Sequence, residues 1–184
     1  MEEPQTQEMP EIRETREEKV LHNAVVVLLF RAGKILLALK TKKIGAGFLN
    51  GYGGGIEELE TPRQTAVREL AEEVGLDVAS EHLMKVGDLY FLNTMLNGET
   101  FECRVRIYCS WKWAGEPRET ETMKQPTWFP MREMPYERMM PADRIWFPIV
   151  LSGKKVRGKF PYGPFQQELI GDYVIEEVES FLED

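Results

Sequence analysis

Three carboxylates, Glu69, Glu72 and Glu73, recur at intervals of three and four residues in the stretch RQTAVRELAEEVGL. On a helix these intervals place side chains on one face, and no lysine four residues further on balances them. Glu72 and Glu73 would also lie near the helix C-terminus, where the helix dipole disfavours negative charge. A hard divalent cation such as Mg²⁺ would reverse these costs, since it prefers oxygen ligands. The alternative is an acidic helix surface that simply faces solvent.

The helix that would position these carboxylates has clear boundaries. Thr61 is a typical N-cap, Pro62 suits the first helical position, and Gln64 completes a capping box with Thr61. Gly75 favours the left-handed conformation in which many helices end. The sequence therefore predicts a helix over residues 62–74. Its packing face consists of apolar residues at helical spacing, Ala66, Val67, Leu70, Ala71 and Val74.

Two neighbours of this helix have the chemistry of a phosphate site. The glycine-rich segment GYGGG, residues 51–55, can turn tightly and bring its backbone close to a metal ion. Arg68, four residues before Glu72, is within reach of that carboxylate. Attack of water on a phosphoanhydride requires neutralisation of phosphate charge and a deprotonated nucleophile, and Mg²⁺ held by carboxylates supplies both.

The composition is that of one globular domain with a full-sized core: 184 residues, 42% hydrophobic and 29% charged. The formal net charge of −8 argues against non-specific binding to nucleic acid or to an anionic membrane. The longest apolar run, Ala24 to Phe30, is far shorter than the ~20 residues of a membrane span, and no signal peptide is evident. We therefore expect a soluble, cytoplasmic protein with no membrane partner.

The chain divides into an acidic tail and one domain. Residues 1–19 contain seven Glu against three Arg or Lys and few apolar residues, so we expect residues 1–20 to form a flexible tail and residues 21–184 to form the domain. Cys103 and Cys109 lie six positions apart in one strand-like run. At about 3.3 Å per residue they would be about 20 Å apart, too far to form a disulfide.

Strand patterns outnumber helical ones in the domain. Residues 22–30 and 34–40 read as a hairpin around residues 31–33. Further strands are expected at 82–92 and 99–115, and a strand pair at 154–160 and 169–178. Short helices are expected within residues 131–140 and 142–153. This order favours an α+β or mixed α/β sandwich.

The stretch from Gly54 to Leu76 resembles the Nudix box, G-x5-E-x7-R-E-U-x-E-E-x-G-U, in which U is a bulky apolar residue. It matches at every defined position: Gly54, Glu60, Arg68, Glu69, Leu70, Glu72, Glu73, Gly75 and Leu76. The resemblance implies an α/β fold, the Nudix α/β/α sandwich with a mixed β-sheet and a loop–helix–loop motif. It also implies an enzyme that uses Mg²⁺ or Mn²⁺ to cleave nucleoside diphosphates linked to another group.

The same resemblance implies roles for individual residues. Glu69 and Glu73 would be metal ligands, Glu72 a further ligand directly or through water, and the carbonyl oxygen of Gly53 an additional one. Arg68 would orient the glutamates, with Glu60 as a supporting residue. The catalytic set would be Glu69, Glu72 and Arg68 together with a glutamate outside the box, which we assign to Glu121 in preference to Glu119.

Beyond the box, residues 22–178 resemble the animal-type oxidised purine nucleoside triphosphatases. The resemblance rests on KIGAGFLNGYGG, KVGDLYF, PTWFPMREMPYERMMPADRIWFP and GKFPYGPFQ. It implies substrate-binding roles for Lys40 on the phosphates, Asn50 and Asp143 on the base, and Phe91 in the pocket wall. Met140 replaces an aromatic residue that would stack on the base. Ala142 replaces the first of two neighbouring acids, so we expect Asp143, without a like charge beside it, to be a poor hydrogen-bond donor.

The expected function is Mg²⁺-dependent hydrolysis of a purine nucleoside triphosphate, including oxidised ones such as 8-oxo-dGTP, to the monophosphate and pyrophosphate. Such an enzyme would remove oxidised nucleotides from the nucleotide pool. Alternatives are another Nudix substrate, such as an ADP-sugar, a dinucleoside polyphosphate or a capped RNA, and a non-catalytic nucleotide-binding module. The partner is a nucleotide; stable nucleic-acid binding is not expected, because the nearest basic cluster, residues 154–157, reads as a solvated strand flank. The sequence leaves monomer and dimer open.

Overall fold

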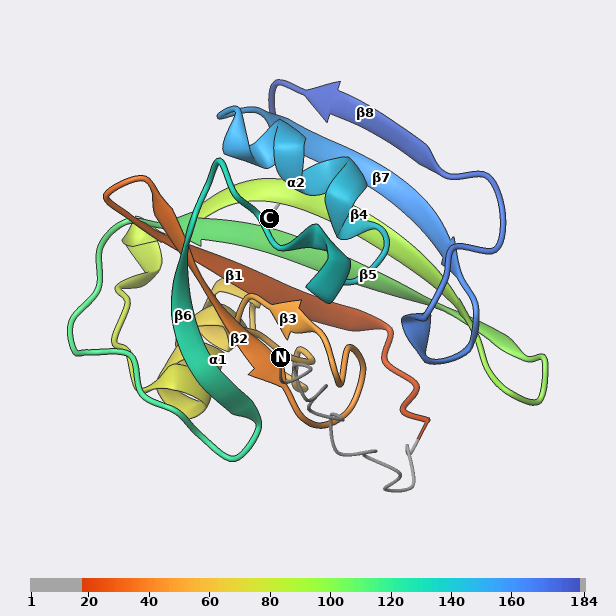
Figure 1. Ribbon diagram of the computed structural model, residues 1–184, viewed down its shortest axis with the longest axis horizontal. Coiled ribbons are helices and arrows are strands. Elements are labelled where there is room, and N and C mark those ends of the chain that lie inside the picture. The colour runs from red at the N-terminus through yellow and green to blue at the C-terminus, as the bar shows by residue number, and fades with distance from the viewer. Residues whose placement is uncertain (1–17, 183–184) are drawn as a thin grey trace, which may run out of the picture.

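A computed structural model describes residues 18–182 of the chain. Most of the expected acidic tail, residues 1–17, lies outside the described residues. Two α-helices and eight strands carry the fold (Figure 1). They are β1 (Asn23–Arg31), β2 (Lys34–Lys40), β3 (Leu49–Asn50), α1 (Pro62–Val74), β4 (Met84–Thr94), β5 (Thr100–Ser110), β6 (Met123–Pro130), α2 (Asp143–Leu151), β7 (Lys155–Tyr162) and β8 (Val174–Val178), with short 3₁₀ turns η1 (Ser80–His82), η2 (Tyr136–Arg138) and η3 (Pro164–Gln166).

The strands form one mixed sheet in the order β3-β2-β1-β5-β4-β7-β8, with β6 paired to β2. β1 pairs with β5 and β4 with β7 in parallel, and the remaining pairs are antiparallel. The expected hairpin of β1 and β2 is confirmed, with Arg31 opposite Lys34. The expected pairing of β7 with β8 is also confirmed.

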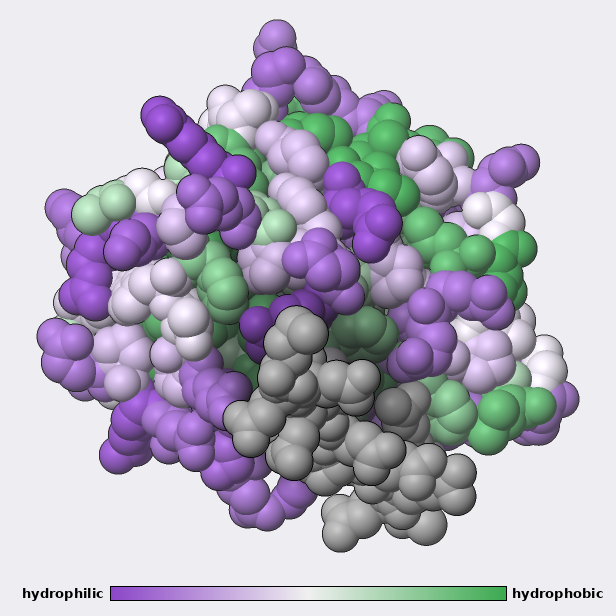
Figure 2. Space-filling view, in the orientation of Figure 1, coloured by the Kyte–Doolittle hydropathy of each residue, from purple (hydrophilic) through white to green (hydrophobic). Residues whose placement is uncertain are grey.

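The two helices cover opposite faces of the sheet (Figure 1). Along β1, Val25, Val27 and Leu29 pack in the core layer beneath α1, whereas Ala24 and Leu28 belong to the layer beneath α2. Because both faces of β1 are buried, the strand reads as a continuous apolar run rather than an alternating one. The expected α/β/α sandwich is confirmed. Figure 2 shows that the face carrying α2 is mixed, with hydrophobic residues gathered around α2 and β7 and hydrophilic residues around the rim.

Helix α1 has the boundaries that its capping residues predict. Thr61 accepts a hydrogen bond from the backbone of Gln64, and the Gln64 side chain accepts one from the Thr61 backbone, so the capping box is complete. Gly75 ends the helix at φ 73°, in the left-handed region. Leu70 and Val74 are fully buried against the sheet, and of the three box carboxylates Glu72 is exposed whereas Glu73 is buried.

Two local expectations were wrong or incomplete. The helix expected within residues 131–140 is only the single turn η2, because Pro135 constrains the preceding residue away from helical geometry. Residues 123–130 form strand β6, which the two prolines at 126 and 130 concealed. Prolines are tolerated there because β6 lies outside the main strand order and pairs only with β2 among the described strands.

Cys103 and Cys109 are both buried and free, as expected from their spacing along β5. Within residues 18–182, no helix combines the length and the apolar character needed to cross a membrane.

Candidate functional site

Arg68 is the centre of an ion-pair cluster on the exposed side of α1. Its guanidinium binds Glu60 through two hydrogen bonds of 2.7 and 2.9 Å and donates to Glu69 at 2.9 Å and to Glu72 at 3.3 Å. It also donates to the Gly55 carbonyl at 3.3 Å. Hydrogen bonds from Arg68 lower the pKa of Glu60 to about 2. Arg68 thus ties the loop before the helix to two of the box carboxylates.

Glu73 lies deeper than the other box carboxylates. Its side chain accepts a hydrogen bond from the backbone N–H of Gly53 at 2.8 Å, and the residue is 8% exposed. Burial raises the pKa of Glu73, while Lys40 and the Gly53 N–H act in the opposite direction. A carboxylate in this position would be stabilised by a bound cation, since burial disfavours its charge.

The glycines before the helix are required by close backbone approach. A Cβ on Gly53 would lie 2.0 Å from the carbonyl oxygen of Val25 in β1, and a Cβ on Gly54 would lie 2.3 Å from Oε1 of Glu69. The loop therefore presses directly against the central strand on one side and against a box carboxylate on the other. No side chain larger than hydrogen fits at either position without displacement.

The carbonyl oxygen of Gly53 already faces a positive charge. Lys40, at the end of β2, directs its ammonium group to this oxygen at 3.5 Å. The N–H of Gly53 thus donates to Glu73, and its carbonyl oxygen accepts from Lys40. A cation already contacts this oxygen. This is the oxygen that the sequence predicts as a metal ligand.

The donor set suits a hard divalent cation, because Glu69, Glu72, Glu73 and the Gly53 carbonyl offer only oxygen. Their side chains are not assembled for it. Within residues 18–182, no three His, Cys, Asp or Glu side chains converge as a metal site. The reason is that Arg68 holds Glu69 and Glu72, whereas Gly53 holds Glu73.

A cavity of about 100 Å³ adjoins this cluster, on the α2 side of the sheet. All five residues that the sequence predicts for substrate binding line it: Lys40, Asn50, Phe91, Met140 and Asp143. Gly53 and Gly54 line it as well. The box loop and the expected base-binding residues therefore border one continuous space.

The cavity wall is largely aromatic and apolar. Phe91 stacks on Tyr162 with ring centroids 5.6 Å apart, and Trp146 also lines the space. Met140 lies with its sulfur 4.0 Å from the amide nitrogen of Asn50. Such a wall suits the flat face of a base. Ala142 is fully buried, with its N–H bonded to the Tyr162 hydroxyl at 2.9 Å.

Asp143 differs from the sequence-based expectation. The absence of a second acid was expected to leave it ionised, yet its pKa is raised to about 7 because burial outweighs the hydrogen bonds that lower it. Its carboxyl accepts hydrogen bonds from Trp146 Nε1 at 3.0 Å and from the Met140 backbone at 3.2 Å, which only partly offset that effect. Desolvation thus replaces the neighbouring charge, and Asp143 can donate a hydrogen bond near neutral pH.

Glu121 is not brought into this cluster. It lies in the exposed loop before β6, where its carboxylate forms an ion pair with Lys42. Glu119, the other candidate, pairs with Lys124 at 3.2 Å in the same loop. The loop contacts the end of the box helix through Thr120, whose hydroxyl donates to the backbone carbonyl of Glu73 at 2.9 Å, and through Arg118, whose N–H donates to the carbonyl of Val74 at 3.0 Å.

Two buried polar residues of the cavity, Asn93 and Gln166, were not predicted from the sequence. Asn93 follows Phe91 by two residues in β4, and side chains two apart in a strand share a face. The pocket role expected of Phe91 could therefore have pointed to Asn93. Gln166 lies in the loop after β7, where no periodic pattern applies.

Comparisons with known proteins agree with this geometry. A model of the NUDIX domain matches residues 20–148. Two proteins named "Oxidized purine nucleoside triphosphate hydrolase" are similar over most of the chain. The one from Danio rerio is 36% identical over 84% of this chain and 94% of its own length, and the one from Mus musculus is 37% identical over 85% and 95%.

The fold is similar to that of a solved MutT protein from Bacillus halodurans. The TM-score is 0.72, with 23% sequence identity, over 85% of this chain and 98% of that chain. At this level of identity the likeness concerns the fold alone.

Proposed function

Since this chain belongs to the Nudix family and is a Nudix hydrolase, we propose that it is a divalent-metal-dependent pyrophosphohydrolase. Its substrate is a purine nucleoside triphosphate, including oxidised forms such as 8-oxo-dGTP, and its products are the monophosphate and pyrophosphate. One observation carries the proposal: Gly53, Gly54 and Lys40 border the same cavity as Phe91 and Asp143. A nucleotide can therefore place its base in the cavity and its phosphates over the box helix.

The glutamates and the arginine of the box have separate tasks in this proposal. Glu69, Glu73 and the Gly53 carbonyl would hold Mg²⁺ or Mn²⁺, and Glu72 would be a further ligand. When bound, the metal neutralises phosphate charge and lowers the pKa of water. Glu72 and Glu69 would receive the proton of the attacking water. Arg68, which bonds to Glu60, Glu69 and Glu72, would orient these carboxylates.

Lys40 contributes positive charge at the phosphates. Its ammonium lies 3.5 Å from the Gly53 carbonyl oxygen. The four-carbon stem of Lys40 is flexible, so the ammonium can turn from that oxygen toward a phosphate oxygen. Glu121 is given no role in this proposal, because its carboxylate forms an ion pair with Lys42.

The base is held by groups of two kinds. Phe91 and Met140 offer apolar surface to its faces, and Asn50 and Asp143 offer hydrogen bonds to its edge. Met140 gives weaker and more adaptable contact than an aromatic ring would. We therefore expect modest discrimination between oxidised and ordinary purines.

A panel of nucleotides with Mg²⁺ tests the proposal. We expect kcat/KM for 8-oxo-dGTP, 2-hydroxy-dATP, dGTP and dATP to exceed that for dCTP by at least about 10-fold, because the cavity wall suits the larger base. The preference for oxidised over ordinary purines should stay below about 100-fold, since an aromatic stack on the base is missing. Faster hydrolysis of ADP-ribose, a dinucleoside polyphosphate or a capped RNA would contradict the proposed substrate.

The raised pKa of Asp143 predicts a pH dependence of stability. Its pKa rises from 3.8 to about 7 on folding, so the folded state binds the proton more tightly. Between pH 4 and 7 the folded protein holds more protons than the unfolded chain, and the contribution of Asp143 to stability falls as pH rises. About 1.4 kcal/mol per pKa unit gives roughly 4 kcal/mol in total.

The free energy of unfolding, measured by urea titration of the natural protein and of Asp143→Asn, isolates this effect. The free energy of unfolding of the natural protein minus that of Asp143→Asn should be largest near pH 4. This difference should decrease as the pH rises to 7 and should level off above pH 7. Tyr136 and Tyr162, which face Asp143, titrate outside this range. A difference that stayed flat, or that increased with pH, would show that Asp143 is ionised in the folded protein throughout.

A further inference from the structure

Two carboxamides, those of Asn93 and Gln166, are buried together in the wall of the cavity. Asn93 is 2% exposed and Gln166 8%. The Gln166 side-chain nitrogen donates to Oδ1 of Asn93 at 3.0 Å, and the Asn93 nitrogen donates to the backbone carbonyl of Phe91 at 3.1 Å. A polar pair placed among Phe91, Tyr162 and other apolar residues is costly unless it has a partner for each group.

The direction of this hydrogen-bond chain is fixed at its inner end. The Phe91 carbonyl can only accept, so the amide of Asn93 must turn its nitrogen toward it and its oxygen toward Gln166. Gln166 must then present its nitrogen to Asn93. Its own oxygen, Oε1, is left over, and none of the hydrogen bonds among residues 18–182 uses it. Since Gln166 lines the cavity, its Oε1 is an acceptor that a bound ligand could use.

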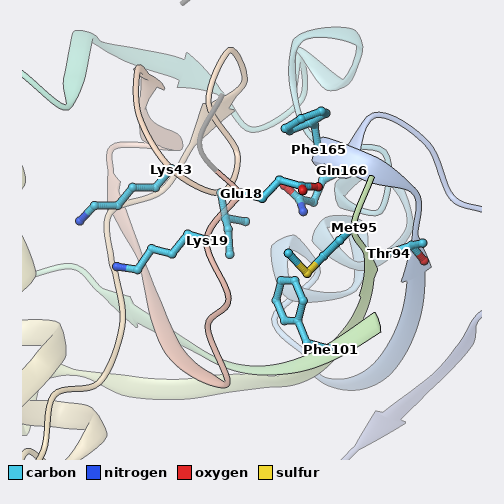
Figure 3. Close-up of a pocket in the computed structure, with 9 residues that line it drawn as sticks. Glu18, Lys19, Lys43, Thr94, Met95, Phe101, Phe165 and Gln166 are labelled. Atoms are coloured by element: carbon cyan, nitrogen blue, oxygen red, sulfur yellow. The ribbon is translucent and has the colours of Figure 1, made fainter. Parts of the chain in front are cut away.

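The backbone at Gln166 and at the residue before it is strained. Phe165 and Gln166 are consecutive non-glycine residues in the left-handed region, at φ 57° and 56°. Such residues persist where the surroundings hold them, and they concentrate at ligand sites. Figure 3 shows Gln166 beneath the ring of Phe165, in a small outer hollow also lined by Glu18, Met95 and Phe101. Gln166 lines both this hollow and the main cavity.

We propose that Gln166 is a specificity-determining residue whose Oε1 accepts a hydrogen bond from an amino group on the purine edge, with Asn93 as its positioning residue. This inference rests on the proposed function, because it requires a purine in the cavity. Asp143 and Asn50 reach the same space from α2 and β3. In this proposal a third segment, the loop that follows β7, also contacts the base.

Substrate pairs that differ in one amino group test the inference: dATP against purine deoxyriboside triphosphate, and dGTP against dITP. In the natural protein we expect kcat/KM to favour the amino-bearing member of at least one pair by about 10- to 100-fold, because a bound base without the amino group would shield Oε1 from water and give it no donor. In Gln166→Met, which keeps the length of the side chain, the ratio should fall to within about 2-fold through slower hydrolysis of the amino-bearing substrate alone.

Gln167→Met is the matched control, since Gln167 is the exposed neighbour, and it should keep the ratio of the natural protein. Asn93→Leu should reduce the ratio without changing Gln166 itself, and thermal melts identify any variant that fails to fold. Equal rates within both pairs in the natural protein, or a ratio preserved in Gln166→Met, would overturn the inference while the proposed function stands. Failure to hydrolyse any nucleoside triphosphate would overturn both.

Discussion

Glu73→Gln is expected to lower kcat about 100- to 10,000-fold at saturating Mg²⁺, because it removes an anionic ligand from the metal whose charge lowers the barrier by several kcal/mol. The free energy of unfolding should stay unchanged or rise by up to about 1 kcal/mol. The amide oxygen can still accept the Gly53 N–H, and a buried charge whose pKa is raised by desolvation is removed. Steady-state kinetics and urea titration measure the two effects.

Glu81→Gln is the matched control for this change. It makes the same substitution on an exposed residue of η1, and we expect turnover close to that of the natural protein. Turnover of Glu73→Gln within about 3-fold of the natural value would show that Glu73 is not a metal ligand. A large loss of stability instead would mean that the charge of Glu73 holds the Gly53 loop.

Gly53→Ala and Gly54→Ala are expected to fail in different ways, although both add one methyl group to neighbouring residues. At Gly53 the methyl group would lie 2.0 Å from the Val25 carbonyl, in the backbone of a central strand. The backbone of this strand cannot move without breaking sheet hydrogen bonds, so we expect the free energy of unfolding to fall by about 3 kcal/mol or more. The variant should be largely unfolded or insoluble at 37 °C.

At Gly54 the methyl group would lie 2.3 Å from Oε1 of Glu69, which is the end of a side chain and can rotate. Stability should fall by only about 1 kcal/mol, whereas the Mg²⁺ concentration for half-maximal activity should rise at least about 10-fold, because a metal ligand is displaced. Gly171→Ala, where the new methyl group makes an ordinary contact with Pro161 at 3.5 Å, serves as the control. Equal stability losses at Gly53 and Gly54 would contradict this account.

Local signals were sufficient to predict the box helix. The capping box of Thr61 and Gln64 and the left-handed Gly75 define its ends, and these depend only on neighbouring residues. The hairpin of β1 and β2 was predictable for the same reason. Strand β6 was not predictable, because its prolines are typical of a loop. Only the structure shows that β2 provides an edge with which β6 can pair.

The site could be predicted as a set of residues but not as an electrostatic environment. The motif identifies Arg68 and its glutamates, yet the sequence does not show that one guanidinium bonds to both Glu69 and Glu72. The pKa of Asp143 was misjudged because complete burial follows from the packing of α2 on the sheet. Gln166 was missed because its position depends on two strained backbone angles in a loop.

We propose that this chain hydrolyses a purine nucleoside triphosphate between the α- and β-phosphates with the help of a divalent metal. Separation of the products of dGTP and 8-oxo-dGTP hydrolysis by anion-exchange chromatography, with Mg²⁺ and with EDTA, tests it most directly. We predict the nucleoside monophosphate and pyrophosphate in equal amounts with Mg²⁺, and no hydrolysis with EDTA. Release of a nucleoside diphosphate and inorganic phosphate, or turnover that persists in EDTA, would contradict the account.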